Sequence, residues 1–173
     1  EQVDGELVGD GAGGVLVTAN GAQVRWLGGW WQGTLTLSNG VQALWAGGDK
    51  RLGDGAVVHN HGAITWTSGL VRSWCWGGPA MFYNHQSGTW VVQAADSLQR
   101  VYSSYPASVV NHGLVMLGTP GALVSSAWQF TQSASGTLAL QLGGTSTPTQ
   151  FGRWESGQRA DVAGVLRVTL SGN

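Results

Sequence analysis

Charged residues and cysteine are scarce in this chain of 173 residues. Charged side chains occupy 10% of the positions, against about 25% in ordinary soluble domains, and the formal net charge is −1. Because no stripe of Lys and Arg is available to neutralise phosphates, nucleic acid is not an expected partner. The single cysteine, Cys75, cannot form an internal disulfide. It is therefore expected either to be buried or to link two chains.

Long apolar runs are also missing. No stretch of about 18 apolar residues is present, so neither a transmembrane helix nor membrane insertion is expected. Residues 1–4 do not show the basic-then-apolar pattern of a signal segment, so an exported protein would correspond to a processed or excised chain. Disorder is not expected, because 42% of the positions are hydrophobic. We expect a single domain over residues 1–173 with a core of its own.

Helical periodicity is hard to find in this sequence. Nearly every window shows roughly three to six alternating residues bounded by Gly, Asn, Ser or Pro, which is the pattern of strands and turns. The sequence therefore predicts an all-β protein.

The dipeptide Asn-His is repeated three times, each time after apolar residues and before a Gly and a short strand-like run. The copies are Asn60-His61, Asn84-His85 and Asn111-His112. Repeats at such a spacing, about 20–50 residues, are typical of solenoids. Turn signals divide the chain into about seven units, each of about the length that one coil of a β-helix needs.

These observations predict a right-handed parallel β-helix (β-solenoid) of about seven coils. An antiparallel β-sandwich is the alternative, because short strands with turns every 8–12 residues or so also describe that fold. Two Asn-Gly pairs, Asn20-Gly21 and Asn39-Gly40, could each close a hairpin. The long-range Asn-His period has no reason to exist in a series of hairpins, which favours the solenoid.

Three patterns in the chain resemble those of a known family. Residues 59–64 and 110–115 resemble aromatic-Asn-Asn-x-Gly-Thr-Val, residues 25–33 resemble Trp-x-Gly-Gly-x-Trp-x-Gly, and residues 130–144 resemble a terminal Phe-Thr-Gln motif that ends in Leu-Gly-Gly. Together they are similar to the Gly-rich irregular β-solenoid repeats of large bacterial cell-surface proteins, of the adhesin and autotransporter-passenger type. The resemblance implies an extracellular, structural or adhesive role and supplies no catalytic residues. His replaces the usual second Asn three times, which leaves the partner open.

The repeated asparagines are candidates for a structural ladder. An inward Asn at the same corner of successive coils can bond to the next amide and to the backbone of the turn. Asn60, Asn84 and Asn111 are the expected members.

The three histidines that follow these asparagines raise the question of a metal site, because neutral imidazole is a common ligand. Residues in one column of a β-helix lie about 4.8 Å apart per coil, so the outer two would be about 10 Å apart. The nitrogens that bind one zinc ion lie at most about 4 Å apart. We therefore expect no metal site and no cofactor.

Four tryptophans form a candidate contact surface. They are Trp30, Trp31, Trp74 and Trp76, which occupy consecutive or alternate positions. Neighbouring residues of an extended chain point to opposite faces, so at least one of Trp30 and Trp31 is expected to be exposed. Exposed Trp beside Gly can contact another subunit or a neighbouring domain, or can stack on a sugar ring.

Catalysis is not expected. None of the nine acidic residues forms a column at the repeat spacing, and no Gly-x-Ser-x-Gly, phosphate loop or dinucleotide fingerprint occurs.

The expected function is a non-catalytic extracellular rod, either a module of a surface protein or a subunit that assembles end to end into filaments, because uncapped ends expose unpaired backbone groups. A carbohydrate- or host-surface-binding module that uses exposed Trp is the alternative. A polysaccharide-active enzyme is third, and it would need two acids converging in a groove. The expected partners are other copies or neighbouring solenoid modules, and glycans in the alternative of a binding module.

Overall fold

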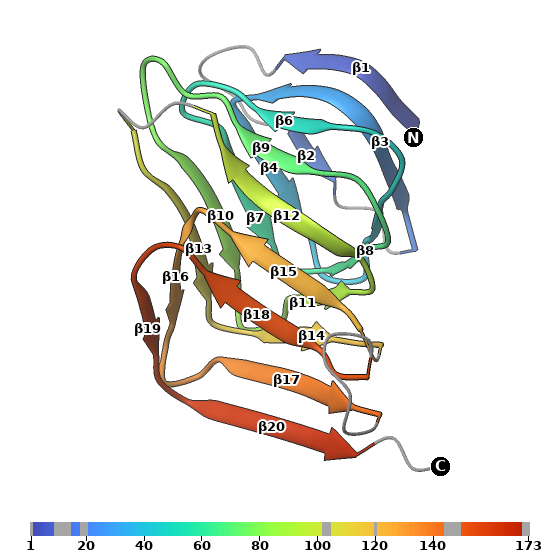
Figure 1. Cartoon of the computed structure of the whole chain (residues 1–173). Coiled ribbons are helices and arrows are strands. Elements are labelled where there is room, and N and C mark those ends of the chain that lie inside the picture. The colour runs from blue at the N-terminus through green and yellow to red at the C-terminus, as the bar shows by residue number, and fades with distance from the viewer. Residues whose placement is uncertain are drawn as a thin grey trace.

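The computed structural model describes residues 2–8, 15–17, 21–101, 105–119, 121–143 and 150–170, which form β-strands and no helix (Figure 1). No segment in these ranges is therefore a helix that could cross a membrane. The strands are β1 (Gln2–Val8), β2 (Val15–Val17), β3 (Gln23–Gln32), β4 (Thr34–Leu37), β5 (Gln42–Trp45), β6 (Lys50–Leu52), β7 (Val57–Asn60), β8 (Ala63–Trp66), β9 (Val71–Ser73), β10 (Ala80–Asn84), β11 (Thr89–Val92), β12 (Ala95–Arg100), β13 (Ala107–Asn111), β14 (Leu114–Leu117), β15 (Leu123–Ser126), β16 (Gln129–Gln132), β17 (Thr137–Leu142), β18 (Arg153–Ser156), β19 (Ala160–Val162) and β20 (Val165–Leu170).

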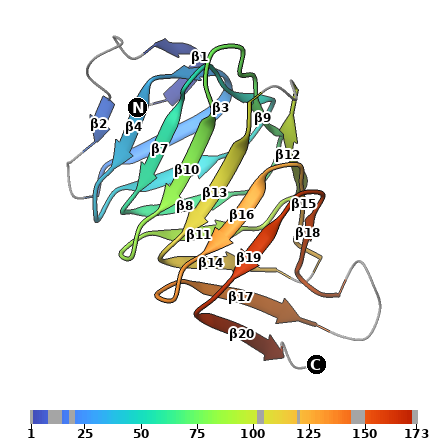
Figure 2. The same ribbon diagram turned by 90° about the vertical axis from the view of Figure 1, so that its left-hand side faces the viewer.

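The strands stack as a parallel β-solenoid, and the predicted fold class is confirmed. One sheet contains seven strands in the order β19-β16-β13-β10-β7-β4-β2, so from β4 to β19 every third strand of the chain pairs with the one before it (Figure 2). The other sheet contains thirteen strands and supplies two faces, which join at the long strand β3. Strand β3 pairs with β5 through its first half and with β6 through its second half.

All pairs between these strands are parallel, so the alternative of an antiparallel sandwich is wrong. Among the described residues the one antiparallel contact is the isolated bridge between Leu142 and Phe151. Five complete turns of three separate strands run from β5–β7 to β17–β19. Strands β1 to β4 lie before them and β20 follows them. The expected count of about seven coils is therefore slightly too high for complete turns, because β3 continues through a corner and β20 stands alone.

Buried and partly exposed side chains alternate along the strands, and the buried ones fill the interior of the solenoid. In β8, Ile64 and Trp66 are buried while Ala63 and Thr65 are partly exposed, as the two-residue period of a strand requires. The same pattern on the neighbouring strand β11 brings aromatic rings together. Trp66 and Trp90 stack with their ring centres 6.0 Å apart. Burial of such large apolar side chains supplies the main driving force for folding.

Glycine is required at corners where successive turns approach closely. A Cβ on Gly88 would lie 2.4 Å from the Asn60 carbonyl oxygen and 2.5 Å from Asn84 Oδ1. A Cβ on Gly113, one turn further, would lie 2.2 Å from the His85 carbonyl oxygen. These glycines follow the Asn-His pairs, so each repeat contains both the polar corner and the residue that lets the next turn pack against it.

Cys75 belongs to the interior. Its Sγ lies 3.7 Å from the Gly53 carbonyl oxygen. Burial raises the pKa of this thiol to about 11, with a further contribution from the charge of Asp54. Of the two expected roles for Cys75, burial is the one observed.

Candidate functional site

Asn60, Asn84 and Asn111 lie at the ends of β7, β10 and β13, with their side chains fully buried in the core. Asn60 Nδ2 donates to Asn84 Oδ1 at 2.8 Å, and Asn84 Nδ2 donates to Asn111 Oδ1 at 2.9 Å. The second proton of each amide goes to a backbone carbonyl of the following turn, that of Leu114 in the case of Asn84. The three amides therefore form a continuous hydrogen-bonded ladder along the axis.

A fourth residue, Gln132, extends this ladder and was missed in the sequence. Asn111 Nδ2 donates to Gln132 Oε1 at 3.0 Å, and Gln132 Nε2 donates to the carbonyl oxygens of Ala163 and Val165. Gln132 stands at the end of β16, three residues before Ser135-Gly136, and its place after an apolar-polar pair is the signal that could have identified it. In the next turn the paired residue is Val162, which cannot continue the ladder.

The histidines lie on the outside of the same corner. All four histidines of the chain gather there, within or directly after β7, β10 and β13. These three strands are neighbours in the seven-stranded sheet (Figure 2). His59 Nδ1 lies 2.9 Å from His85 Nε2. The rings of His61 and His85 are parallel, with their centres 4.0 Å apart. His112 makes a hydrogen bond to Ser133 Oγ through Nδ1, at 2.9 Å. This set, His59, His61, His85 and His112, is called the His cluster below.

The electrostatics of the His cluster keep its central rings neutral. Burial, followed by the charges of His61, His59 and His112, lowers the pKa of His85 to about 4. Burial and the charge of His61 also lower the pKa of His59. At neutral pH both side chains therefore present one protonated and one unprotonated nitrogen.

The four predicted surface tryptophans divide into different environments. Trp31 is only 4% exposed and belongs to the core, so its place in a contact surface was predicted wrongly. Trp30 and Trp74 form an edge-to-face pair with ring centres 5.5 Å apart, and the Arg51 guanidinium lies 5.4 Å from the Trp30 ring and 5.9 Å from the Trp74 ring. Trp76 is 65% exposed, in a turn whose backbone N–H groups donate to Asp54 Oδ1.

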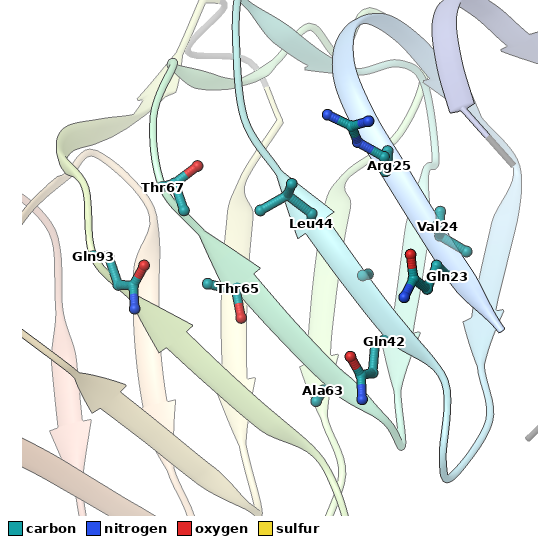
Figure 3. Close-up of a pocket in the computed structure, with 10 residues that line it drawn as sticks. Gln23, Val24, Arg25, Gln42, Leu44, Ala63, Thr65, Thr67 and Gln93 are labelled. Carbon is teal, nitrogen blue, oxygen red and sulfur yellow. The ribbon is translucent and has the colours of Figure 1, made fainter. Parts of the chain in front are cut away.

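A shallow groove crosses the outer face of β3, β5 and β8 (Figure 3). Side chains that reach it include Gln23, Arg25, Gln42, Leu44, Thr65 and Gln93. No carboxylate and no aromatic ring lines it. The groove can therefore offer hydrogen bonds and one cation, but neither a pair of acids nor a stacking platform.

Several of the described acids are engaged in ion pairs or turns. Asp49 lies 3.0 Å from Arg72 and 3.8 Å from Arg51, Glu155 pairs with Arg153, and Asp161 pairs with Arg159. Because each partner is a cation, the pairs resemble structural contacts more than the two facing carboxyl groups of a glycoside hydrolase.

Among the residues whose burial is described, one charged side chain lies inside the solenoid. Lys50, in β6, is fully buried, and its Nζ donates to the carbonyl oxygens of Gly48 at 3.1 Å and Ser68 at 2.9 Å. Burial lowers its pKa to about 8, opposed by the charges of Asp96 and Asp49. Nothing in the sequence distinguishes this residue from a surface lysine.

The C-terminal end of the described stack is uncovered. In β20, Leu166 pairs with Leu138 and Val168 with Leu140, which belong to the core or pack against it. The same positions in β20 are 59% and 50% exposed, and Leu170 is 76% exposed. These three side chains therefore occupy positions that continue the core of the preceding turn, but among the described residues no further strand covers them.

No family model, no curated protein and no solved structure matches this chain. The similarity of its sequence patterns to bacterial surface proteins therefore remains a prediction, while the β-solenoid itself is observed.

Proposed function

We propose that this chain is a non-catalytic, extracellular structural rod that stacks end to end with another β-solenoid through its C-terminal turn. The observation that carries this proposal is the apolar surface of β20. Leu166, Val168 and Leu170 continue the interior pattern of β17, but solvent reaches them. Apolar interior positions left open on this scale are typical of a surface that another element covers.

The backbone at this end supports the same proposal. Strands β18, β19 and β20 are each the last strand on their side of the stack, while β1 and β2 are the first strands at the opposite end (Figure 1). An edge strand presents unpaired N–H and C=O groups that can template another strand. Because the strands within each face are parallel, the last turn of one copy matches the direction of the first turn of the next. Such a head-to-tail contact does not close on itself and generates a filament.

The energies indicate a weak, concentration-dependent assembly. Complete burial of a Val or Leu side chain stabilises by about 1.5–3 kcal/mol, and the exposed side chains of β20 would each gain a part of that. Association costs about 4–15 kcal/mol in lost freedom of movement. The apolar contacts alone are comparable to this cost, so edge hydrogen bonds must supply the surplus.

The test is sedimentation velocity over a wide range of protein concentration, with negative-stain images of the most concentrated samples. We expect the wild type to form rods that lengthen with concentration, and Leu166→Lys to remain monomeric. Thr169→Lys is the matched control, because Thr169 points outward from the same strand and pairs with Gln141. A wild type that stays monomeric at all concentrations would refute the proposal.

A carbohydrate-binding role is the second candidate, and the pair of Trp30 and Trp74 favours it. These rings lie together on the side of the rod with Arg51 over both. Aromatic faces with a nearby hydrogen-bond donor are suited to sugar rings. Binding to a glycan array that disappears in Trp74→Ala but survives Trp76→Ala would support this role. Trp31 is unsuitable for the test, since its loss would open the core.

A further inference from the structure

Three of the four clustered histidines could serve one ion. His59 lies on the outer face of β7, and His61 follows in the bend after this strand, where its side chain is also partly exposed. His85 belongs to the next turn and contacts both: its Nε2 lies 2.9 Å from His59 Nδ1, and its ring lies parallel to that of His61 at 4.0 Å. All three are partly exposed, and a shallow depression lined by His61, His85, Gln86 and Ser87 opens beside them.

The spacing argument against a metal site applies to a single column. His61, His85 and His112 do form one column, in which the rings of His85 and His112 are already 6.4 Å apart. His59 lies outside that column, and its Nδ1 lies beside Nε2 of His85. The spacing of the Asn-His repeat does not predict this contact, because His59 is not part of an Asn-His pair. The donors therefore come from two neighbouring columns, and only two turns are needed.

We propose that His59, His61 and His85 form a surface site for a divalent transition metal ion of the copper, nickel or zinc type. Two nitrogens bound to one tetrahedral ion lie about 3.4 Å apart, so the contact between His59 and His85 has to open by about 0.5 Å. His61 completes the site by turning its ring away from the stacked position. Among the described residues no group of three such side chains is already placed to hold a metal ion, so the proposed site forms only when His61 moves.

The chemistry of the surroundings selects the kind of ion. The only described carboxylate of the seven-stranded sheet is Asp161, on β19, which lies three strands from His85 and hence about 14 Å away. The thiol of Cys75 is buried elsewhere in the core. A site built only from imidazole favours Cu²⁺, Ni²⁺ and Zn²⁺ and disfavours Ca²⁺ and Mg²⁺, which require oxygen ligands.

The site is independent of the proposed stacking, because it lies over β7 and β10, in the middle of the rod. His112 provides a matched control: it belongs to the same cluster, but its Nδ1 is bonded to Ser133 Oγ. The ladder residues Asn60 and Asn84 are not altered by substitution of their neighbours, so the folded structure is expected to survive in the variants.

The test is isothermal titration calorimetry of the tag-free protein with NiCl₂, together with electron paramagnetic resonance of its CuCl₂ complex. We expect one Ni²⁺ per chain, no response to MgCl₂, and two or three nitrogen ligands on Cu²⁺. His59→Asn and His85→Asn should each weaken Ni²⁺ binding at least about tenfold, while His112→Asn changes it less than about twofold. His85→Gln serves as a second variant if His85→Asn does not fold, as judged by circular dichroism in EDTA. Absence of saturable Ni²⁺ binding to the wild type, or binding that survives loss of His85, would overturn the proposal.

Discussion

Asn84 and His85 are neighbours in the chain, yet their side chains lie on opposite sides of the same sheet and differ in burial and in the partners that they need. The Asn84 side chain is fully buried and makes hydrogen bonds to Asn60, Asn111 and the Leu114 carbonyl. The His85 side chain is partly exposed and contacts the imidazoles of His59 and His61. A polar group buried inside the solenoid costs free energy unless it finds a protein partner, whereas an exposed group can bond to water instead. The inner residue is thus fixed by folding, and the outer one is available for binding.

Loss of the buried Asn84 amide should cause the largest loss of stability. Asn84→Ala removes three hydrogen bonds: one Asn60 N–H loses its acceptor, the Leu114 carbonyl loses a donor, and Asn111 Oδ1 keeps only the Gly113 N–H. Because each unsatisfied buried group costs about 1–3 kcal/mol, we expect the free energy of unfolding to fall by about 3–5 kcal/mol, measured by urea denaturation. His85→Asn, one residue away, should change it by less than about 1 kcal/mol. Equal losses in the two variants would contradict the distinction between the two sides.

The second largest loss of stability should come from a substitution that crowds the inner side of the corner. Gly88→Ala places a Cβ against the Asn60 carbonyl and the Asn84 amide, neither of which can move without disturbing the ladder. We expect a loss of about 2–4 kcal/mol in the free energy of unfolding. The control is Gly77→Ala, where the new Cβ would make only ordinary contacts of 3.6 Å or more with Asp54. A Gly88→Ala protein as stable as the control would mean that the turns can separate freely at this corner.

The smallest expected change is the pH dependence of stability that comes from the buried Lys50. The pKa of Lys50 is about 8 in the folded protein and about 10.5 in the unfolded chain, so the unfolded chain binds more protons between these values. Stability should therefore rise as pH increases from 8 to about 10.5. Relative to Lys50→Met, which lacks this titration, the wild type should gain about 1–3 kcal/mol between pH 7 and pH 10 in urea denaturation. A constant difference between the two proteins across that range would contradict the pKa shift.

The repeat in the sequence predicted the stacking well because a solenoid repeats its contacts. Asn60, Asn84 and Asn111 recur at nearly one coil length, and the register pairs them directly. Gln132 was missed because the pattern changes from Asn-His to Gln-Ser while the position in the coil is kept. The alternation of Trp30 and Trp31 predicted that the pair would be divided between two faces, but it gave no indication of which residue lies inside.

The sequence by itself predicted an all-β protein and favoured coils stacked in parallel over an antiparallel sandwich, since the long-range period of its Asn-His pairs has no reason to exist in a series of hairpins. The tertiary structure alone decided which chemical groups meet. His59 reaches His85, Lys50 is enclosed, and Leu166 is left uncovered because of side-chain direction and the register between residues more than 20 positions apart. Those contacts depend on how each corner turns, and a one-dimensional repeat carries no information on that geometry.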